Sequence, residues 1–219
     1  MSTKQDTGTN RSAFVWIAVG VVVVVGLFVW AIMSGGATSS GGGSYEVEAF
    51  GDVEVSGDAL PILDPANVGI AELDPAAGLP APVVTSTDFD GVASSIGDAS
   101  GPQLVVFLAH WCPHCQAEVP RLVDQMAGTS SIDGVEVVGV ATSSNATRTN
   151  FPPAAWLDGE GWTGGLLMDD SDASALRAYG LGSFPAWAAV SADGTVAARA
   201  TGELTPDQVS QLAAIAAGG

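Results

Sequence analysis

Basic residues are scarce in this chain of 219 residues, which has six Lys and Arg against 24 Asp and Glu and a formal net charge of −18. Two of the six, Lys4 and Arg11, precede a long apolar run. The four that follow it stand among 23 acidic residues: Arg121, Arg148, Arg177 and Arg199. Such an acidic surface argues against binding nucleic acid and against peripheral binding to anionic lipid. We interpret the charge as a contribution to solubility.

Cysteine and histidine are equally scarce, with two of each. Because Cys112 and Cys115 are the two cysteines, no separate structural disulfide can accompany them. A structural zinc site takes four ligands, and the remaining candidates, His110 and His114, lie in the same short segment, where tetrahedral convergence is unfavourable. We therefore expect no metal and no cofactor. A C-x-x-C pair between a strand and a helix is typical of a redox site.

Residues 13–33 form an apolar run without a charge, long enough to cross the hydrocarbon core as a helix. Lys4 and Arg11 place its N-terminal side in the cytoplasm. We predict a cytoplasmic tail (1–12), a transmembrane helix (13–33), a Gly/Ser linker (34–44), an acidic N-terminal extension (45–77) and an extracytoplasmic domain (78–219) at the cell membrane. The alternative is a cleaved signal peptide, whose apolar core is usually only about 7–15 residues long.

From residue 82 onward, patterns typical of strands and helices alternate. Strands are expected at 83–86, near Val92, and at 103–109, 135–141, 166–168, 185–190 and 195–200. Helices are expected at 113–126, at 170–179 and from Thr205, and a short edge strand is expected within 45–55. This order predicts an α/β sheet that is parallel at first and ends antiparallel.

The C-x-x-C pair lies in the segment Trp111-Cys112-Pro113-His114-Cys115, between a buried strand and a helix that begins at Pro113. A helix N-terminus favours the thiolate form of the leading thiol, Cys112. We expect the His114 N–H or charge to stabilise that thiolate further and so to make the couple more oxidising; the alternative is a merely solvated histidine. We interpret Trp111 as a flat apolar surface for a partner peptide. The alternative is an aromatic side chain of the core, and the two interpretations are compatible.

Several segments carry a family resemblance. They are residues 78–82 followed by 88–91, the strand and turn 107–115, the continuation Cys115-Gln116-Ala117-Glu118-Val119-Pro120, the segment from Tyr179-Gly180 to Phe184-Pro185-Ala186, and the turn Asp193-Gly194. Together they resemble the thioredoxin superfamily, and most of all its membrane-anchored, extracytoplasmic thiol–disulfide oxidoreductases of the redoxin or TlpA/ResA type. The resemblance implies a thioredoxin fold, with a central mixed sheet flanked by helices and an N-terminal hairpin extension.

The resemblance also implies roles for individual residues. Cys112 is the expected exposed nucleophile, which forms the mixed disulfide, and Cys115 the buried resolving thiol. Pro185 is expected to be cis and, with Phe184 and Trp111, to contact a bound peptide. Glu118 corresponds to a buried carboxylate near the thiols that can take the Cys115 proton. Its alternative is an exposed helix residue paired with Arg121 or Arg177.

The dipeptide Pro113-His114 between the cysteines is that of the periplasmic oxidant DsbA, so these two residues are the expected redox-tuning positions. We predict an enzyme that exchanges disulfides with secreted or membrane proteins and has a membrane redox partner. One alternative is a dedicated reductant of a client such as apocytochrome c. Another is a non-catalytic binding module with the thioredoxin fold, in which the two cysteines form a static disulfide.

Overall fold

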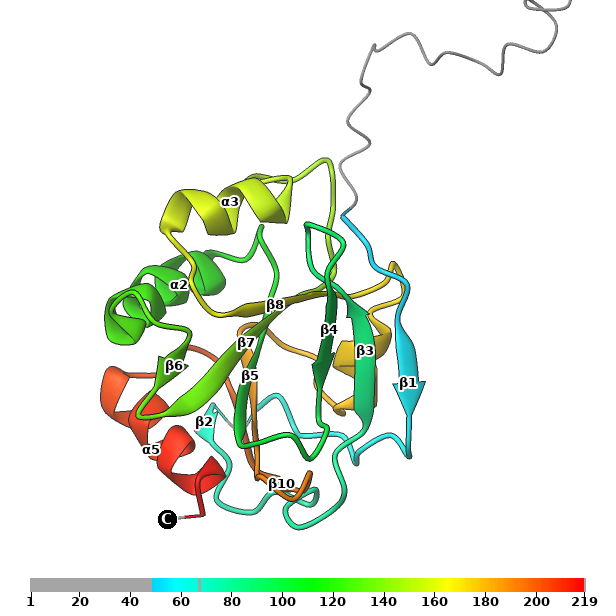
Figure 1. Ribbon diagram of the computed structural model, residues 1–219, viewed down its shortest axis with the longest axis vertical. Helices are drawn as coiled ribbons and strands as arrows, with labels where there is room; N and C mark the ends of the chain where they lie inside the picture. The colour runs from blue at the N-terminus through cyan, green and yellow to red at the C-terminus, as the bar shows by residue number, and fades with distance from the viewer. Residues whose placement is uncertain (1–48, 67, 219) are drawn as a thin grey trace, which may run out of the picture. The chain divides into compact units, whose positions relative to one another are not determined.

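The structure is a computed structural model, and it describes residues 49–66 and 68–218 (Figure 1). The predicted cytoplasmic tail, transmembrane helix and linker lie outside these residues. In the part that is described, no helix combines the length and the apolar character needed to cross a membrane. The described residues fall within one structural unit that starts at Val47. The N-terminal extension from Ala49 onward therefore belongs to the same unit as the predicted domain.

The described helices are α2 (Pro113–Met126), α3 (Pro153–Glu160), α4 (Ser174–Ala178) and α5 (Pro206–Ala216). The strands are β1 (Glu54–Ser56), β2 (Gly69–Ile70), β3 (Val83–Thr87), β4 (Ala93–Ile96), β5 (Gln103–Leu108), β6 (Ser131–Ile132), β7 (Val135–Ala141), β8 (Gly165–Met168), β9 (Ala186–Val190) and β10 (Val196–Thr201).

A mixed sheet of seven strands forms the centre of the unit, in the order β2-β10-β9-β5-β7-β6, with β8 also paired to β7. The strands β5, β7 and β8 run parallel, whereas β9 and β10 are antiparallel to their neighbours, as the sequence predicts. A second sheet has the order β1-β3-β4, and its β3-β4 hairpin is the predicted N-terminal hairpin. The predicted α/β fold of the thioredoxin type, with a central mixed sheet and an N-terminal hairpin, is therefore confirmed.

Strand β5 divides the interior into two cores, because successive side chains of a strand point to opposite faces of the sheet. Leu104, Val106 and Leu108 pack on the side of α2 and α5. Val105 and Phe107 pack on the other side, with α4 and the β3-β4 hairpin. In Figure 1, α2 and α5 lie together on one side and β3 and β4 on the other. Every residue of β5 is buried, which places the end of this strand, and the cysteines after it, on a rigid base.

The predicted helix at 170–179 is shorter than expected. The carboxylate of Asp170 accepts hydrogen bonds from the backbone N–H groups of Asp172 and Ser174. Ala173 has a φ of 55°, in the left-handed region, so a helix cannot continue through it. These residues form a turn instead, and α4 begins only at Ser174.

Candidate active site

The two cysteines follow directly from β5. Cys112 is the N-cap residue of α2, Pro113 occupies the first helical turn, and the backbone N–H of Cys112 donates to the carbonyl of Ala109 at 2.9 Å. The Cys112 side chain is 7% exposed, and its Sγ lies 3.8 Å from the carbonyl oxygen of Phe184. The nucleophile predicted from the sequence therefore sits at a helix N-terminus and faces the segment before Pro185.

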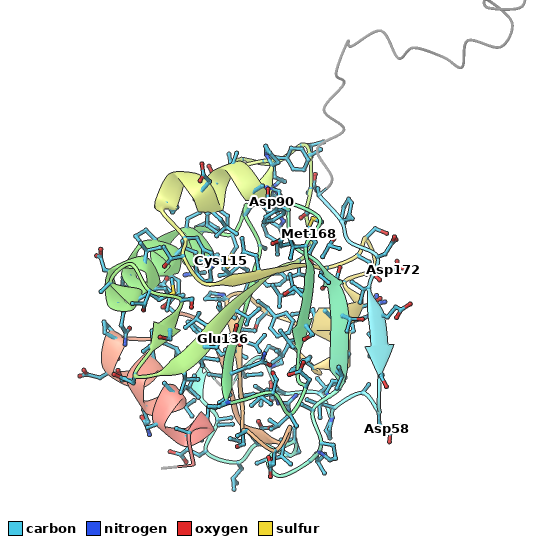
Figure 2. All side chains as sticks on the ribbon, viewed as in Figure 1. Asp58, Asp90, Cys115, Glu136, Met168 and Asp172 are labelled. Carbon is cyan, nitrogen blue, oxygen red and sulfur yellow. The ribbon has the colours of Figure 1, made fainter. Side chains whose placement is uncertain are left out.

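Cys115 lies one helical turn further on and is fully buried. Figure 2 shows Cys115 where α2, the helix that carries it, packs against the sheet. Burial raises the pKa of the Cys115 thiol, and the neighbouring Cys112 and Glu118 raise it further, although a hydrogen bond with the backbone of Ala109 opposes the shift. Both cysteines are free thiols in the structure. The prediction that Cys112 is exposed is wrong, because this residue packs against the carbonyl of Phe184 and is itself buried. It is still the more accessible of the two thiols, 7% exposed against 0% for Cys115, an order that suits a nucleophile and a resolving thiol.

Glu118 is also fully buried, as the first of its two predictions states, but it pairs with Arg121, one of the partners that the alternative named. Its Oε2 accepts hydrogen bonds from Arg121 at 2.9 Å and from the backbone N–H of Leu204 at 3.0 Å, while Oε1 has no partner. Burial raises the pKa of this carboxyl group, and the bonds from Leu204 and Arg121 oppose the shift. A carboxyl group with one free oxygen, close enough to raise the pKa of Cys115, is suited to proton transfer.

His114 has a partner that the sequence does not reveal. Its Nδ1 lies 2.6 Å from Oε1 of Glu203, so the imidazole donates to the carboxylate. The other oxygen of Glu203 accepts from Arg121 at 2.7 Å, and Arg121 also donates to Glu118. These hydrogen bonds hold the pKa of Glu203 below its usual value, with the His114 bond contributing most. A chain of hydrogen bonds through Glu203 and Arg121 thus connects the exposed His114 to the buried Glu118.

Trp111, Phe184 and Pro185 lie next to Cys112. The Phe184–Pro185 peptide bond is cis, as the resemblance implies. The rings of Trp111 and Phe184 meet edge to face with their centroids 5.8 Å apart, and the Trp111 Nε1 donates to the carbonyl of Ser143 at 2.8 Å. Trp111 is half-buried, so it is both part of the packing and accessible, as the two compatible interpretations allow.

A groove of about 400 Å³ opens beside these residues. It is lined by Pro65, Val68, His114, Ser183, Phe184, Thr201, Gly202 and Glu203. It therefore adjoins both the dipeptide between the cysteines and the segment before Pro185. Within the described residues, no group of three or more His, Cys, Asp or Glu side chains is placed to hold a metal ion.

Comparison with known proteins agrees with this geometry. Residues 76–215 match the family model of the redoxins. A thiol–disulfide oxidoreductase named ResA, from Geobacillus thermodenitrificans, is 26% identical over 137 residues, which is 62% of this chain and 75% of that protein.

Two solved structures share the fold. A thioredoxin-family thiol:disulfide interchange protein from Chlorobium tepidum is 22% identical, with a TM-score of 0.52 over 63% of this chain and 94% of its own. A thiol:disulfide interchange protein from Bacteroides is 24% identical, with a TM-score of 0.51 over 66% of this chain and 91% of its own. The match to the redoxin family and the similarity to ResA confirm the predicted enzyme class, a thioredoxin-like oxidoreductase. The chain belongs to the Redoxin family.

Proposed function

We propose that the chain is a membrane-anchored thiol–disulfide oxidoreductase that exchanges disulfides with extracytoplasmic proteins through Cys112 and Cys115. The observation that carries the proposal is the placement of Cys112 at the start of α2, opposite the Phe184 carbonyl, with Cys115 enclosed behind it. The apolar run at 13–33 and the basic residues before it support the anchor and its orientation.

The reaction consists of two thiol–disulfide exchanges. The Cys112 thiolate attacks one sulfur of a partner disulfide, and the other partner sulfur leaves as a thiolate and takes up a proton. Cys115 then loses its proton, to Glu118 in our proposal, and attacks the Cys112 sulfur. The partner leaves with two thiols, and the enzyme keeps the Cys112–Cys115 disulfide. Two electrons have passed to the partner, and the reverse sequence oxidises a partner dithiol.

We expect the full chain in detergent to catalyse both reduction of insulin and oxidative refolding of a reduced protein. A reduction potential below about −300 mV together with no activity in either assay would instead indicate a static disulfide. Trapping of thiols in whole cells then gives the direction of electron flow. Cys112 and Cys115 found mainly as a disulfide indicate an oxidant, and found mainly as thiols they indicate a reductant supplied by a membrane redox partner.

Replacement of His114 by proline is expected to lower the reduction potential. His114 follows Cys112 by two residues, and its loss removes the N–H or charge that we expect to favour the Cys112 thiolate and hence the reduced pair. A fall of about 30 mV corresponds to a tenfold change in the equilibrium with a reference dithiol.

Equilibration with glutathione of known redox state measures the potential of the His114→Pro variant. The control is His114→Ala, which removes the imidazole without introducing a proline ring and should shift the potential in the same direction. A potential that rises or stays unchanged in both variants contradicts the role given to His114.

A further inference from the structure

The loop of residues 143–150 is fixed by hydrogen bonds to His110 and Trp111, the two residues that precede Cys112. His110 binds this loop with both ring nitrogens: Nδ1 lies 2.7 Å from the carbonyl of Thr149, and Nε2 accepts from the backbone N–H of Asn145 at 3.0 Å. The Trp111 indole donates to Ser143 of the same loop. The two residues immediately before Cys112 therefore hold the loop in place.

The same loop carries an exposed arginine next to Trp111. The guanidinium carbon of Arg148 lies 4.9 Å from the centre of the Trp111 ring, a distance at which a cation is attracted to the face of an indole. The backbone of Arg148 is fixed in turn, because its N–H donates to the carbonyl of Asn145 at 3.1 Å. The cation is thus positioned over the aromatic surface beside Cys112.

In the described part of this strongly acidic protein, Arg148 carries a positive charge without an ion-pair partner. No carboxylate among the described residues lies within ion-pair distance of it. The other arginines are engaged elsewhere: Arg121 with Glu118 and Glu203, and the buried Arg199 with Asp74. Arg177 is exposed on α4, which packs against the opposite face of the sheet from α2.

We propose that Arg148 is a specificity-determining residue, which favours client segments that carry a carboxylate next to the reactive cysteine. This inference rests on the proposed function. The net charge of −18 repels an acidic client, and the unpaired cation over Trp111 reverses that sign locally, on the aromatic surface that Trp111 forms with Phe184 next to Cys112. The partner chemistry is therefore an acidic peptide.

The test uses the oxidised full chain in detergent and three capped peptides with one cysteine flanked by Asp, Asn or Lys. Stopped-flow tryptophan fluorescence follows attack of each peptide thiol on the Cys112–Cys115 disulfide. Because the flanking residues change the intrinsic reactivity of the thiol, the quantity compared is the ratio of wild-type to variant rate for each peptide.

Arg148→Gln is expected to slow the Asp peptide about twofold to fivefold at low ionic strength, the effect of one exposed ion pair, and to leave the Asn peptide nearly unchanged. Arg148→Glu should slow the Asp peptide more and accelerate the Lys peptide. At 1 M salt, where the screening length is only about 3 Å, these differences should vanish. The matched control is Arg177→Gln, which makes the same charge change on the other face of the sheet and should not alter any ratio.

The proposal is wrong if Arg148→Gln changes the rate of the Asp peptide by the same factor as the rate of the Asn peptide. This holds whether both rates stay the same or both fall. Disulfide exchange itself is tested separately with the uncharged reductant dithiothreitol. A wild-type disulfide that reacts with neither dithiothreitol nor any peptide contradicts the proposed function. A disulfide that reacts with all of them, but with equal wild-type to variant ratios for the three peptides, contradicts only the role of Arg148.

Discussion

Replacement of Cys115 by serine is expected to abolish turnover and to leave the client attached to Cys112 as a stable mixed disulfide. Cys115 is fully buried, one helical turn behind Cys112, and the chain contains no third cysteine that can attack the mixed species. A non-reducing gel of the full-length variant incubated with an oxidised client should show an adduct with the summed mass, which disappears on addition of dithiothreitol.

The matched control is Cys112→Ser, which leaves only the buried thiol. Burial raises the pKa of Cys115, so this thiol is protonated at neutral pH and shielded from a client. No adduct is expected, and turnover should fall to the uncatalysed rate. An adduct that forms with Cys112→Ser but not with Cys115→Ser would reverse the two roles. In the wild-type protein, release of the client should accelerate as pH rises, because Cys115 must lose its proton before it attacks.

The longer elements could be predicted from the sequence because they contain enough residues to show a pattern. The bounds predicted for the helix at Pro113–Met126 agree with α2, and the apolar run at 135–141 agrees with β7. Strands β2 and β6 contain two residues each, too few for an alternation to show. They exist because they pair with β10 and β7, contacts that no local pattern records.

The candidate site could also be predicted only in part from the sequence. The cysteine pair and the cis Phe184–Pro185 bond follow from segments that resemble a known family. Glu203 lies 89 residues from His114 in the sequence, in a stretch without a motif, so their contact depends on the folded arrangement of β10 and α2. Arg148 likewise reaches Trp111 only through the loop that His110 fixes. Sequence patterns thus located the two cysteines, whereas the charged groups around them became visible only in the fold.

Replacement of Asp74 by alanine is expected to destabilise the protein by about 3–5 kcal/mol, the usual cost of leaving one partner of a buried ion pair alone. The side chains of Arg199 and Asp74 are 0% and 2% exposed, and their closest contact is 2.6 Å. Arg199 also donates to the carbonyls of Pro61 and Tyr179. The pair therefore fastens the N-terminal extension to β10 and to the end of α4, and without Asp74 a buried cation loses its counter-charge.

Urea unfolding of the full chain in detergent, followed by tryptophan fluorescence, measures this loss. The matched control is Asp58→Ala, an exposed carboxylate in the same extension, which should change stability by no more than about 0.5 kcal/mol. Burial alone would raise the pKa of Asp74, but the hydrogen bonds and charge of Arg199 hold it below its usual value. The wild-type protein should therefore exceed Asp74→Ala in free energy of unfolding by the full amount above about pH 4, where the unfolded carboxyl ionises. This difference should decline as the pH falls further. An advantage that is small at pH 7, or that grows in acid, would show that the ion pair does not stabilise the attachment of the extension.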